Sequence, residues 1–368
     1  MSADTVDLAV QAVWSYSAAH NGVPLATTFA ALLKSNQRFL LTGHENPDGD
    51  CLGAQVALFH LLRALGKQPQ IVNPDPITKS FDFLQRHTTF GHARADEPLP
   101  AFDVIVLLDC AQLSRVGQLG QRLKQSGKPI AVIDHHVGSD KGDGAACYVD
   151  VTAAATGALV RRLFAEFGVP LGAAAAEGVF VSLVSDTGWF RYSNADAEVF
   201  AMASELVAAG VDGSLVYDNL YRRNHPDSAA LMAEALHRHR LRLSGKLAIV
   251  SLDKVLVERA ARAEFDTDAV LDPLRSLQGV EVVALLKERF DGTVKCSLRS
   301  RRDVDVQAVV AAFGGGGHKK AAGATLRMSL DAATAAIENG VQQALNCCAR
   351  DAAGAAPAMP TPQRGDRS

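Results

Sequence analysis

Four stretches of the sequence place acidic or imidazole side chains directly after an apolar run. They are HENPDGD, the end of VLLDC, IDHH and the end of SLVSD. Their ionisable residues are His44, Asp48, Asp50, Asp109, Asp134, His135, His136 and Asp186. The three adjacent ionisable residues at 134–136, beside an expected buried strand, are costly to desolvate unless a metal ion, a phosphate or solvent pairs with them. The grouping therefore predicts a site that binds charge.

Carboxylates gathered at one point repel one another and require cations. One metal ion takes three or four protein ligands when water or substrate completes its coordination, so six or more candidate ligands indicate two ions. Carboxylate oxygens and imidazole nitrogens without a thiolate suit Mn²⁺ best, with Mg²⁺, Co²⁺ or Zn²⁺ as alternatives. Two such ions are the usual machinery of phosphoryl hydrolysis, which is the chemistry we expect here.

Each stretch also has a purely structural interpretation when it is taken alone. Residues 46–49 are turn-like, Asp109 is suited to cap a following helix, and Asp186 is suited to cap a loop segment. The triplet at 134–136 is harder to explain as solvent-exposed surface. Because all four stretches stand at the ends of expected strands or helices, we favour the metal-site interpretation.

The elements that would position these residues alternate between strands and helices. Apolar strands are predicted at 38–44, 68–74, 102–110 and 128–136, and helices at 49–66, 153–168, 173–188 and 194–210. We expect Asn194 to be the N-cap of the last helix. This order predicts an α/β fold, a parallel sheet with helices on both faces, whose strands end at one edge where ligands gather.

A smaller mixed α/β domain is predicted in the second part of the chain. Its expected strands are 246–252, 280–290 and 293–300, the last two joined by the hairpin turn Asp291–Gly292. We divide the chain into a helical N-terminal extension, a catalytic domain, a helical linker, a substrate-binding domain and a disordered tail, at residues 1–35, 36–225, 226–244, 245–348 and 349–368.

A run of four glycines followed by basic residues, FGGGGHKKAAG, stands in this second domain. Consecutive glycines let a backbone approach an anion and turn its N–H groups toward it. The candidate substrate contacts are Gly315, Gly316, Gly317 and His318, and a flexible hinge is the alternative. On the preceding strand, Arg299 is the candidate for a phosphate or base contact.

The segment GWFRYSN, which follows Asp186, offers aromatic and cationic groups of the kind that stack on bases. Arg191 and Asn194 are candidate substrate contacts there, whereas Phe190 is equally suited to the core. The His and Arg side chains at 237–242 are more typical of a solvated helix face.

The composition excludes several classes of protein. The 368 residues are 48% hydrophobic and 21% charged, which is typical of a globular protein of two domains. A net charge of −3 provides no general basic surface for a long duplex nucleic acid. Six scattered cysteines indicate free thiols, and no signal peptide or membrane-spanning run is visible. We therefore expect a cytoplasmic protein that contacts no membrane.

Together, the four stretches and the glycine run resemble the motifs of the DHH phosphoesterases and of their DHHA1 domain. The resemblance extends over residues 38–330 and is greatest to the branch of nanoRNA-degrading oligoribonucleases and pAp phosphatases. The sequence departs from the family pattern at Cys51 and Ala54, which concerns local packing and a backbone contact rather than the metal ligands.

The resemblance implies a role for each candidate residue. The first metal ion would be held by His44, Asp48 and Asp109. The second ion would be held by Asp50, Asp109, His135 and Asp186. Asp109 would thus bridge the two ions, His136 would face the scissile phosphate, and Asp134 would fix the tautomer of an imidazole.

The implied function is metal-dependent hydrolysis of short oligoribonucleotides, or of 3′-phosphoadenosine 5′-phosphate (pAp) to AMP. A limit of about two to five nucleotides is expected because the metals and the anion-binding glycines would stand on different domains. The expected partners are short single-stranded RNA or DNA oligonucleotides or small nucleotides. A homodimer is possible. A cyclic-dinucleotide or linear pApA or pGpG phosphodiesterase is an alternative. An inactive nucleotide-binding regulator, which has no need of a complete ligand set, is the alternative of another class.

Overall fold

The computed structural model describes residues 26–139, 142–144, 146–223, 225–301 and 303–354. The described residues form two compact units, the first ending at Arg223 and the second following it. Of the expected N-terminal extension, residues 1–25 lie outside the described part, and Ala26–Ser35 form helix α2. Of the expected tail, the first residues belong to helix α13 (Leu330–Gly354), and the others lie outside the described part.

The first unit contains a sheet of six parallel strands. They are β1 (Arg38–Thr42), β2 (Gln68–Asn73), β3 (Phe90–His92), β4 (Val104–Leu108), β5 (Ile130–Asp134) and β6 (Ala146–Val149). Their order is β3-β2-β1-β4-β5-β6, and each neighbouring pair is parallel. The direction of strand addition therefore reverses between β1 and β4, and ligands of open α/β sheets bind at the carboxyl ends of the strands at such a point.

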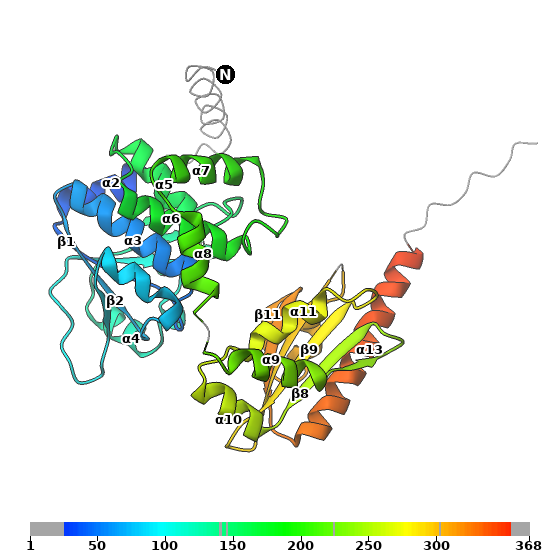
Figure 1. Ribbon diagram of the computed structural model, residues 1–368. Helices are drawn as coiled ribbons and strands as arrows, with labels where there is room; N and C mark the ends of the chain where they lie inside the picture. The colour runs from blue at the N-terminus through cyan, green and yellow to red at the C-terminus, as the bar shows by residue number, and fades with distance from the viewer. Residues whose placement is uncertain (1–25, 140–141, 145, 224, 302, 355–368) are drawn as a thin grey trace, which may run out of the picture. The chain divides into compact units, whose positions relative to one another are not determined.

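Helices cover both faces of this sheet, because its strands are apolar on both sides. Leu41, Val106 and Ile133 pack on one face, and Leu40 and Ile105 pack on the other. The first face is covered by α3 (Gly49–Ala64) and α5 (Thr156–Glu166), and α6 (Ala173–Asp186) packs on these two helices. Helices α7 (Ala197–Ala208) and α8 (Gly213–Tyr221) belong to the same apolar core. The second face is covered by η2 (Leu113–Val116) and α4 (Gly117–Gln125). The predicted α/β fold is confirmed (Figure 1).

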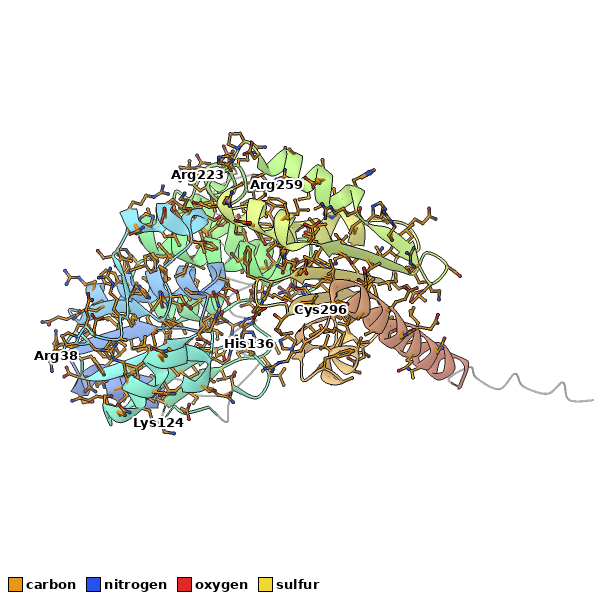
Figure 2. All side chains as sticks on the ribbon, turned by 90° about the horizontal axis from the view of Figure 1, so that it is seen from below. Arg38, Lys124, His136, Arg223, Arg259 and Cys296 are labelled. Atoms are coloured by element: carbon orange, nitrogen blue, oxygen red, sulfur yellow. The ribbon has the colours of Figure 1, made fainter. Side chains whose placement is uncertain are left out.

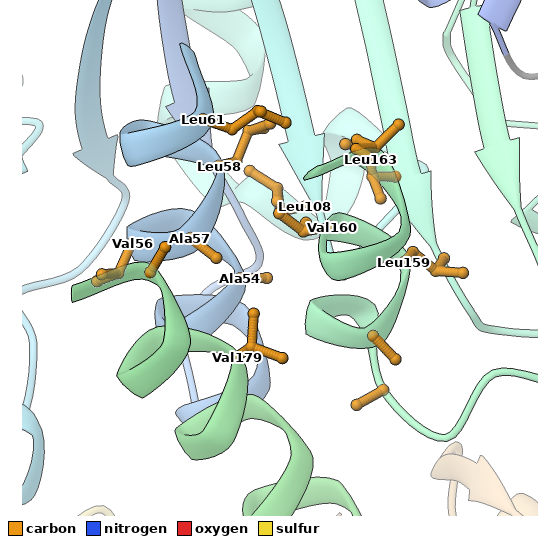
Figure 3. Packing of buried hydrophobic residues seen from close by; sticks show 14 of the residues in the cluster. Ala54, Val56, Ala57, Leu58, Leu61, Leu108, Leu159, Val160, Leu163 and Val179 are labelled. Atoms are coloured by element: carbon orange, nitrogen blue, oxygen red, sulfur yellow. The ribbon is translucent and has the colours of Figure 1, made fainter. Parts of the chain in front are cut away.

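Small residues bring three of these helices close together. A Cβ atom built on Gly53 of α3 would stand 2.3 Å from the carbonyl oxygen of Gly178 in α6. A Cβ atom on Gly157, the second residue of α5, would stand 2.2 Å from Ser182 Oγ of α6. Figure 3 shows Leu108 of β4 between Leu58 of α3 and Val160 of α5, with Val179 of α6 on the side of Ala54. The first two turns of α3 and the first turn of α5 can therefore approach α6 closely.

The second unit is built on a mixed sheet. Its strands are β7 (Arg240–Arg242), β8 (Leu247–Leu252), β9 (Val282–Glu288), β10 (Val294–Ser300), β11 (Gly316–His318) and β12 (Ala321–Leu326). Their order is β11-β12-β10-β9-β8-β7, with β8 and β9 parallel and the other neighbours antiparallel. One face carries α12 (Val306–Ala311) and α13, and the other carries α9 (Ser228–His237), α10 (Lys254–Arg262) and α11 (Leu271–Arg275) (Figure 1). The predicted mixed α/β architecture is confirmed.

The prediction that Asn194 caps α7 is wrong. The N-cap is Asp196, whose carboxylate accepts the N–H of Val199. The amide of Asn194 is engaged elsewhere, because it donates to the carbonyl oxygens of Ala154 and Asp186. In the described part of the chain, no single helix is long and apolar enough to cross a membrane, and α7 and α8, which meet that test as a pair, are bent by 104°.

Two segments of the second unit have more regular structure than their sequences suggest. Residues 226–244, where we expected a helical linker, contain α9 and also β7, an Arg-Leu-Arg strand that pairs with β8 at the sheet edge. The glycine run is part of a hairpin, since β11 pairs antiparallel with β12 and places Gly316 opposite Gly323. The two short strands leave Lys319 and Lys320 in the turn between them.

We expect Gly53→Ala to lower the free energy of unfolding by about 1–3 kcal/mol, because the added methyl group overpacks the crossing of α3 and α6. Urea unfolding of the metal-free protein measures the change. Gly213→Ala, at the start of α8, is the matched control, because its Cβ atom would make ordinary contacts of 3.4 Å and 3.8 Å with Phe180. Equal stabilities of the two variants would contradict the close-crossing argument.

Candidate metal centre

The candidate ligands meet at the carboxyl ends of β1, β4 and β5. In chain order they are His44 after β1, Asp48 and Asp50 at the start of α3, Asp109 after β4, Asp134, His135 and His136 at the end of β5, and Asp186 at the end of α6. Figure 2 shows His136 on the side of the first unit away from Arg38, the first residue of β1. The site thus lies where the strand order reverses, as the parallel sheet predicts.

The first group of possible ligands consists of His44, Asp48 and Asp109, whose ligand atoms all lie within 4.8 Å of one another. His44 Nε2 is 3.1 Å from Asp109 Oδ2 and 3.8 Å from Asp48 Oδ1. Its other nitrogen, Nδ1, donates to the carbonyl oxygen of Glu45 at 2.8 Å. Because a carbonyl can only accept, this contact leaves Nε2 of a neutral imidazole free to bind a metal ion.

The second group consists of Asp50, His135 and Asp186. His135 Nε2 lies 3.1 Å from Asp186 Oδ2, 3.4 Å from Asp50 Oδ2 and 3.7 Å from Asp109 Oδ1. The Nδ1 atom of His135 donates to the carbonyl oxygen of Ala153 at 3.1 Å. Its Nε2 atom is buried and makes no hydrogen bond of regular geometry with any described residue. A buried nitrogen among three carboxylates without a hydrogen bond fits a metal ion.

Asp109 faces both groups at once. Its Oδ2 atom points to His44, and its Oδ1 atom lies near His135 and, at 3.5 Å, near Nδ1 of His136. The backbone of Asp109 is in the left-handed region, with φ of 60°, and its N–H donates to the carbonyl oxygen of Ile133. Such a conformation is unfavourable for a residue with a side chain and is concentrated at functional sites. It aims one carboxylate between two ligand groups.

The protonation of the site shows how much negative charge it holds. Burial, followed by the charges of Asp109 and Asp186, raises the pKa of Asp50 well above its usual value. Burial lowers the pKa of His44, but its interactions with the carboxylates of Asp109 and Asp48 outweigh this and raise that pKa to about 10. Burial likewise lowers the pKa of His135, and the carboxylates of Asp186 and Asp50 raise it to about 10. Protons on the imidazoles therefore supply the positive charge that metal ions would bring.

His136 is oriented by Asp134. Its Nδ1 atom lies 2.7 Å from Asp134 Oδ1, and this hydrogen bond raises the pKa of His136 against the opposing effect of burial. Asp134 also accepts the backbone N–H groups of His135 and His136 and the hydroxyl of Ser139. With Nδ1 held in this way, the Nε2 side of the ring is the side available to a substrate.

The carboxylate of Asp50 is held by residues that the sequence analysis did not identify. Its oxygens accept the backbone N–H groups of Thr156 and Gly157, at 2.8 Å and 3.2 Å, and the hydroxyl of Ser182. The first two donors begin α5, whose N-cap residue Ala155 offers no side-chain acceptor. Their sequence, AAATGA, has no pattern that would mark them, since their role depends on a carboxylate more than one hundred residues away.

The segment after Asp186 turns sharply before it reaches the two predicted substrate contacts. Trp189 and Phe190 have φ angles of 58° and 62°, in the left-handed region. Arg191 is exposed, and its Nε atom donates to the carbonyl oxygen of Gly188. Asn194 is exposed and joins this segment to the loop before α5 through Ala154. Both residues therefore have structural contacts, and a contact of either with substrate stays a prediction.

In the second unit, the structure separates the roles of the consecutive glycines. A Cβ atom on Gly315 would stand 2.5 Å from the carbonyl oxygen of Gly323, and Gly317 has φ of 134° and a similar conflict with Ala321. A Cβ atom on Gly316 would meet nothing within 4 Å. His318, two residues after Gly316, is exposed, and Arg299 of β10 is opposite Ala321 in the neighbouring strand. Gly316 is thus the glycine of this set whose presence packing does not explain.

Comparison with known proteins identifies the family. The family model for "DHH family, N-terminal domain" matches residues 38–183, and the model for "DHHA1 domain" matches residues 253–343. The "Bifunctional oligoribonuclease and PAP phosphatase NrnA" of Thermus thermophilus is 34% identical, over 82% of this chain and 88% of the relative. The chain therefore belongs to the DHH family of phosphoesterases and carries a DHHA1 domain, which confirms the resemblance seen in its motifs.

One further relative and one solved structure are also similar to this chain. The "Cyclic-di-AMP phosphodiesterase GdpP" of Geobacillus thermodenitrificans is 28% identical over 80% of this chain, but over 45% of its own length. A solved structure of an exopolyphosphatase-related protein from Bacteroides fragilis has a TM-score of 0.79 at 22% identity and covers 87% of this chain and 96% of that chain. The second likeness shows that the fold is shared.

We expect the metal-free protein to lose stability as the pH rises from about 6.5 toward 10. A histidine whose pKa is raised by folding stabilises the native state fully below its unfolded pKa of about 6.5, and this contribution is lost as the pH rises through about 10. Saturating Mn²⁺, which takes the place of the protons, should reduce the slope.

Urea unfolding between about pH 6.5 and about pH 8.5, in EDTA and in Mn²⁺, measures both slopes. Asp109→Asn should have a smaller slope in EDTA than the unsubstituted protein, because it removes a carboxylate that raises both pKa values. Equal slopes of the unsubstituted protein in EDTA and in Mn²⁺ would show that these histidines do not bind the metal.

Proposed function

We propose that this chain hydrolyses short oligoribonucleotides to mononucleotides and pAp to AMP, with two Mn²⁺ ions as its cofactor. The observation that carries the proposal is the orientation of Asp109, whose two oxygens face two separate groups of possible metal ligands. The relative from Thermus thermophilus, named for oligoribonuclease and PAP phosphatase activity, supports this class of substrate.

We assign the ligands as two overlapping sets. His44, Asp48 and Asp109 hold one ion, and Asp50, Asp109, His135 and Asp186 hold the other. Two bound cations would neutralise charge on the phosphate and lower the pKa of an attacking water. The short spacing of these side chains around Asp109 supports the assignment.

His136 is assigned to the reacting phosphate. Its ring is held through Nδ1 by Asp134 and is one-third exposed, at 33% of its side-chain surface. The hydrogen bond to Asp134 raises the pKa of His136, which favours a protonated ring that can donate to a phosphate or leaving oxygen. Asp134, which accepts donors on both oxygens, has the positioning role.

The glycine hairpin of the second unit is assigned to the recognition of a substrate phosphate. Gly316 and His318 are exposed, and Lys319 and Lys320 stand in the turn beside them. Backbone N–H groups without a neighbouring side chain, next to cationic side chains, suit an anion. Arg299 is assigned to the same task, since β10 is the neighbour of β12 in the sheet.

One alternative has a specific observation in its favour. The relative from Geobacillus thermodenitrificans, named as a cyclic-di-AMP phosphodiesterase, matches 80% of this chain, although the match covers 45% of the relative. The same metal chemistry would serve a cyclic or linear dinucleotide, so a substrate panel must include both. An inactive nucleotide-binding regulator is disfavoured, because all the candidate ligands are present and close together.

Asp109→Ala should lower the hydrolysis of every substrate by about a thousandfold or more, because it removes the carboxylate common to both ligand groups. The assay uses Mn²⁺ with a dinucleotide, a pentanucleotide, pAp, cyclic di-AMP and an oligonucleotide of about 24 residues. Asp82→Ala, an exposed carboxylate of the same unit, is the control and should be fully active. Faster cleavage of the long oligonucleotide than of the dinucleotide would contradict the proposed preference for short substrates.

Gly316→Ala should raise KM about tenfold with little change in kcat, because the methyl group would separate the backbone from a bound phosphate. The stability of the protein should be unchanged, since the site of the added atom is open within the second unit. Thr325→Ala, an exposed change on the paired strand β12, is the control. An unaltered KM would remove this glycine from the proposed phosphate contact.

A further inference from the structure

Thr156 touches two carboxylates of the candidate metal centre. Its backbone N–H donates to Asp50 Oδ2 at 2.8 Å, and its hydroxyl donates to Asp109 Oδ1 at 3.2 Å. The side chain is completely buried, at 0% exposure. The hydroxyl must be the donor to an ionised Asp109, because a carboxylate only accepts. One buried residue therefore orients a carboxylate of α3 and another that follows β4.

The contact with Asp109 is specific to one of its two oxygens. Oδ2 faces His44 at 3.1 Å, whereas Oδ1, which accepts from Thr156, lies on the side of His135. Asp50, the other partner of Thr156, also lies on the side of His135, at 3.4 Å. One contact of Thr156 thus involves Asp50 of the second group, and the other involves the oxygen of Asp109 that lies toward His135. Neither contact involves His44 or Asp48.

The position of Thr156 in the fold makes these contacts rigid. It is the first residue of α5, and the N–H groups that begin a helix have no partner within it. Asp50 accepts two of these groups, so the start of the helix and the carboxylate fix one another. Thr156 has a β-branched side chain with few rotamers, and its hydroxyl is therefore held toward Asp109.

We propose that Thr156 is a positioning residue that aligns Asp50 and Asp109 for the second metal ion. The proposal rests on the proposed function in that two metal ions bind at this centre. Groups that hydrogen-bond to metal ligands typically contribute 10–100-fold to metal affinity. Loss of the hydroxyl should therefore weaken the ion at Asp50, His135 and Asp186 by at least about tenfold and leave the ion at His44 and Asp48 nearly unchanged.

The test is a calorimetric titration of the metal-free full-length protein with Mn²⁺. Thr156→Val keeps the shape and the backbone N–H but removes the hydroxyl, and Thr156→Ser keeps the hydroxyl. We expect two Mn²⁺-binding events in each protein. Both should have the same affinity in Thr156→Ser as in the unsubstituted protein, whereas one of the two should be weakened in Thr156→Val. Electron paramagnetic resonance at two equivalents of Mn²⁺ should show a spin-coupled pair of Mn²⁺ ions in the unsubstituted protein and in Thr156→Ser. The signal of this pair should be smaller in Thr156→Val.

Thr152→Val is the matched control, because its hydroxyl donates to Asp150, a carboxylate outside the ligand groups, in the loop before the same helix. Thermal unfolding in EDTA establishes that each variant folds, and Thr156→Ala replaces Thr156→Val in the titration if the latter does not. Two unweakened events for the hydroxyl-free variant, or equal weakening of both, would overturn the proposal. Hydrolysis assays separate it from the proposed function, which fails if the unsubstituted protein binds two Mn²⁺ ions but cleaves no nucleotide.

Discussion

The buried carboxylate of Asp50 is the interaction on which the arrangement of the first unit depends. It lies in the first turn of α3, and it accepts the N–H groups of Thr156 and Gly157 from α5 and the hydroxyl of Ser182 from α6. A carboxylate removed from water needs such donors, and the start of a helix has N–H groups that need an acceptor. One side chain meets both needs. The small residues at the helix crossings are a condition for it, since a larger residue at 157 would displace Ser182.

The parallel sheet determines where this negative charge collects. Strand order reverses between β1 and β4, so the segments after these strands diverge and leave room at their carboxyl ends. Asp109 enters that space in a left-handed conformation, which costs about 1–3 kcal/mol and is maintained by the surrounding structure. The conformation is understandable if the residue serves two ligand groups, because each oxygen of its carboxylate then has a partner of its own. Stability and function therefore make different demands on this residue.

In the second unit, the glycine run also contains some residues required by the fold and another that the fold does not require. Gly315 and Gly317 are required by the close pairing of β11 with β12, since a side chain at either position would overlap the neighbouring backbone. Gly316, which lies between them, meets no such obstacle and is exposed. The hairpin thus uses two glycines to form its own structure and presents a third to solvent. A glycine-rich motif that is treated as a single feature conceals this difference.

Apolar periodicity and ligand-type residues are local properties of the chain. They were therefore enough to predict the α/β class, the strands that precede the acidic and imidazole residues, and the family. The sequence did not reveal that Asp196 rather than Asn194 caps α7. The amide of Asn194 donates to the carbonyl oxygens of Ala154 and Asp186, and the contact with Ala154, 40 residues away, depends on the folded chain. The folded chain was needed to show which oxygen of Asp109 faces which group of ligands, and that Thr156 lies against two carboxylates. Those contacts join residues far apart in the chain, and their existence depends on how closely the helices pack, which no local pattern records.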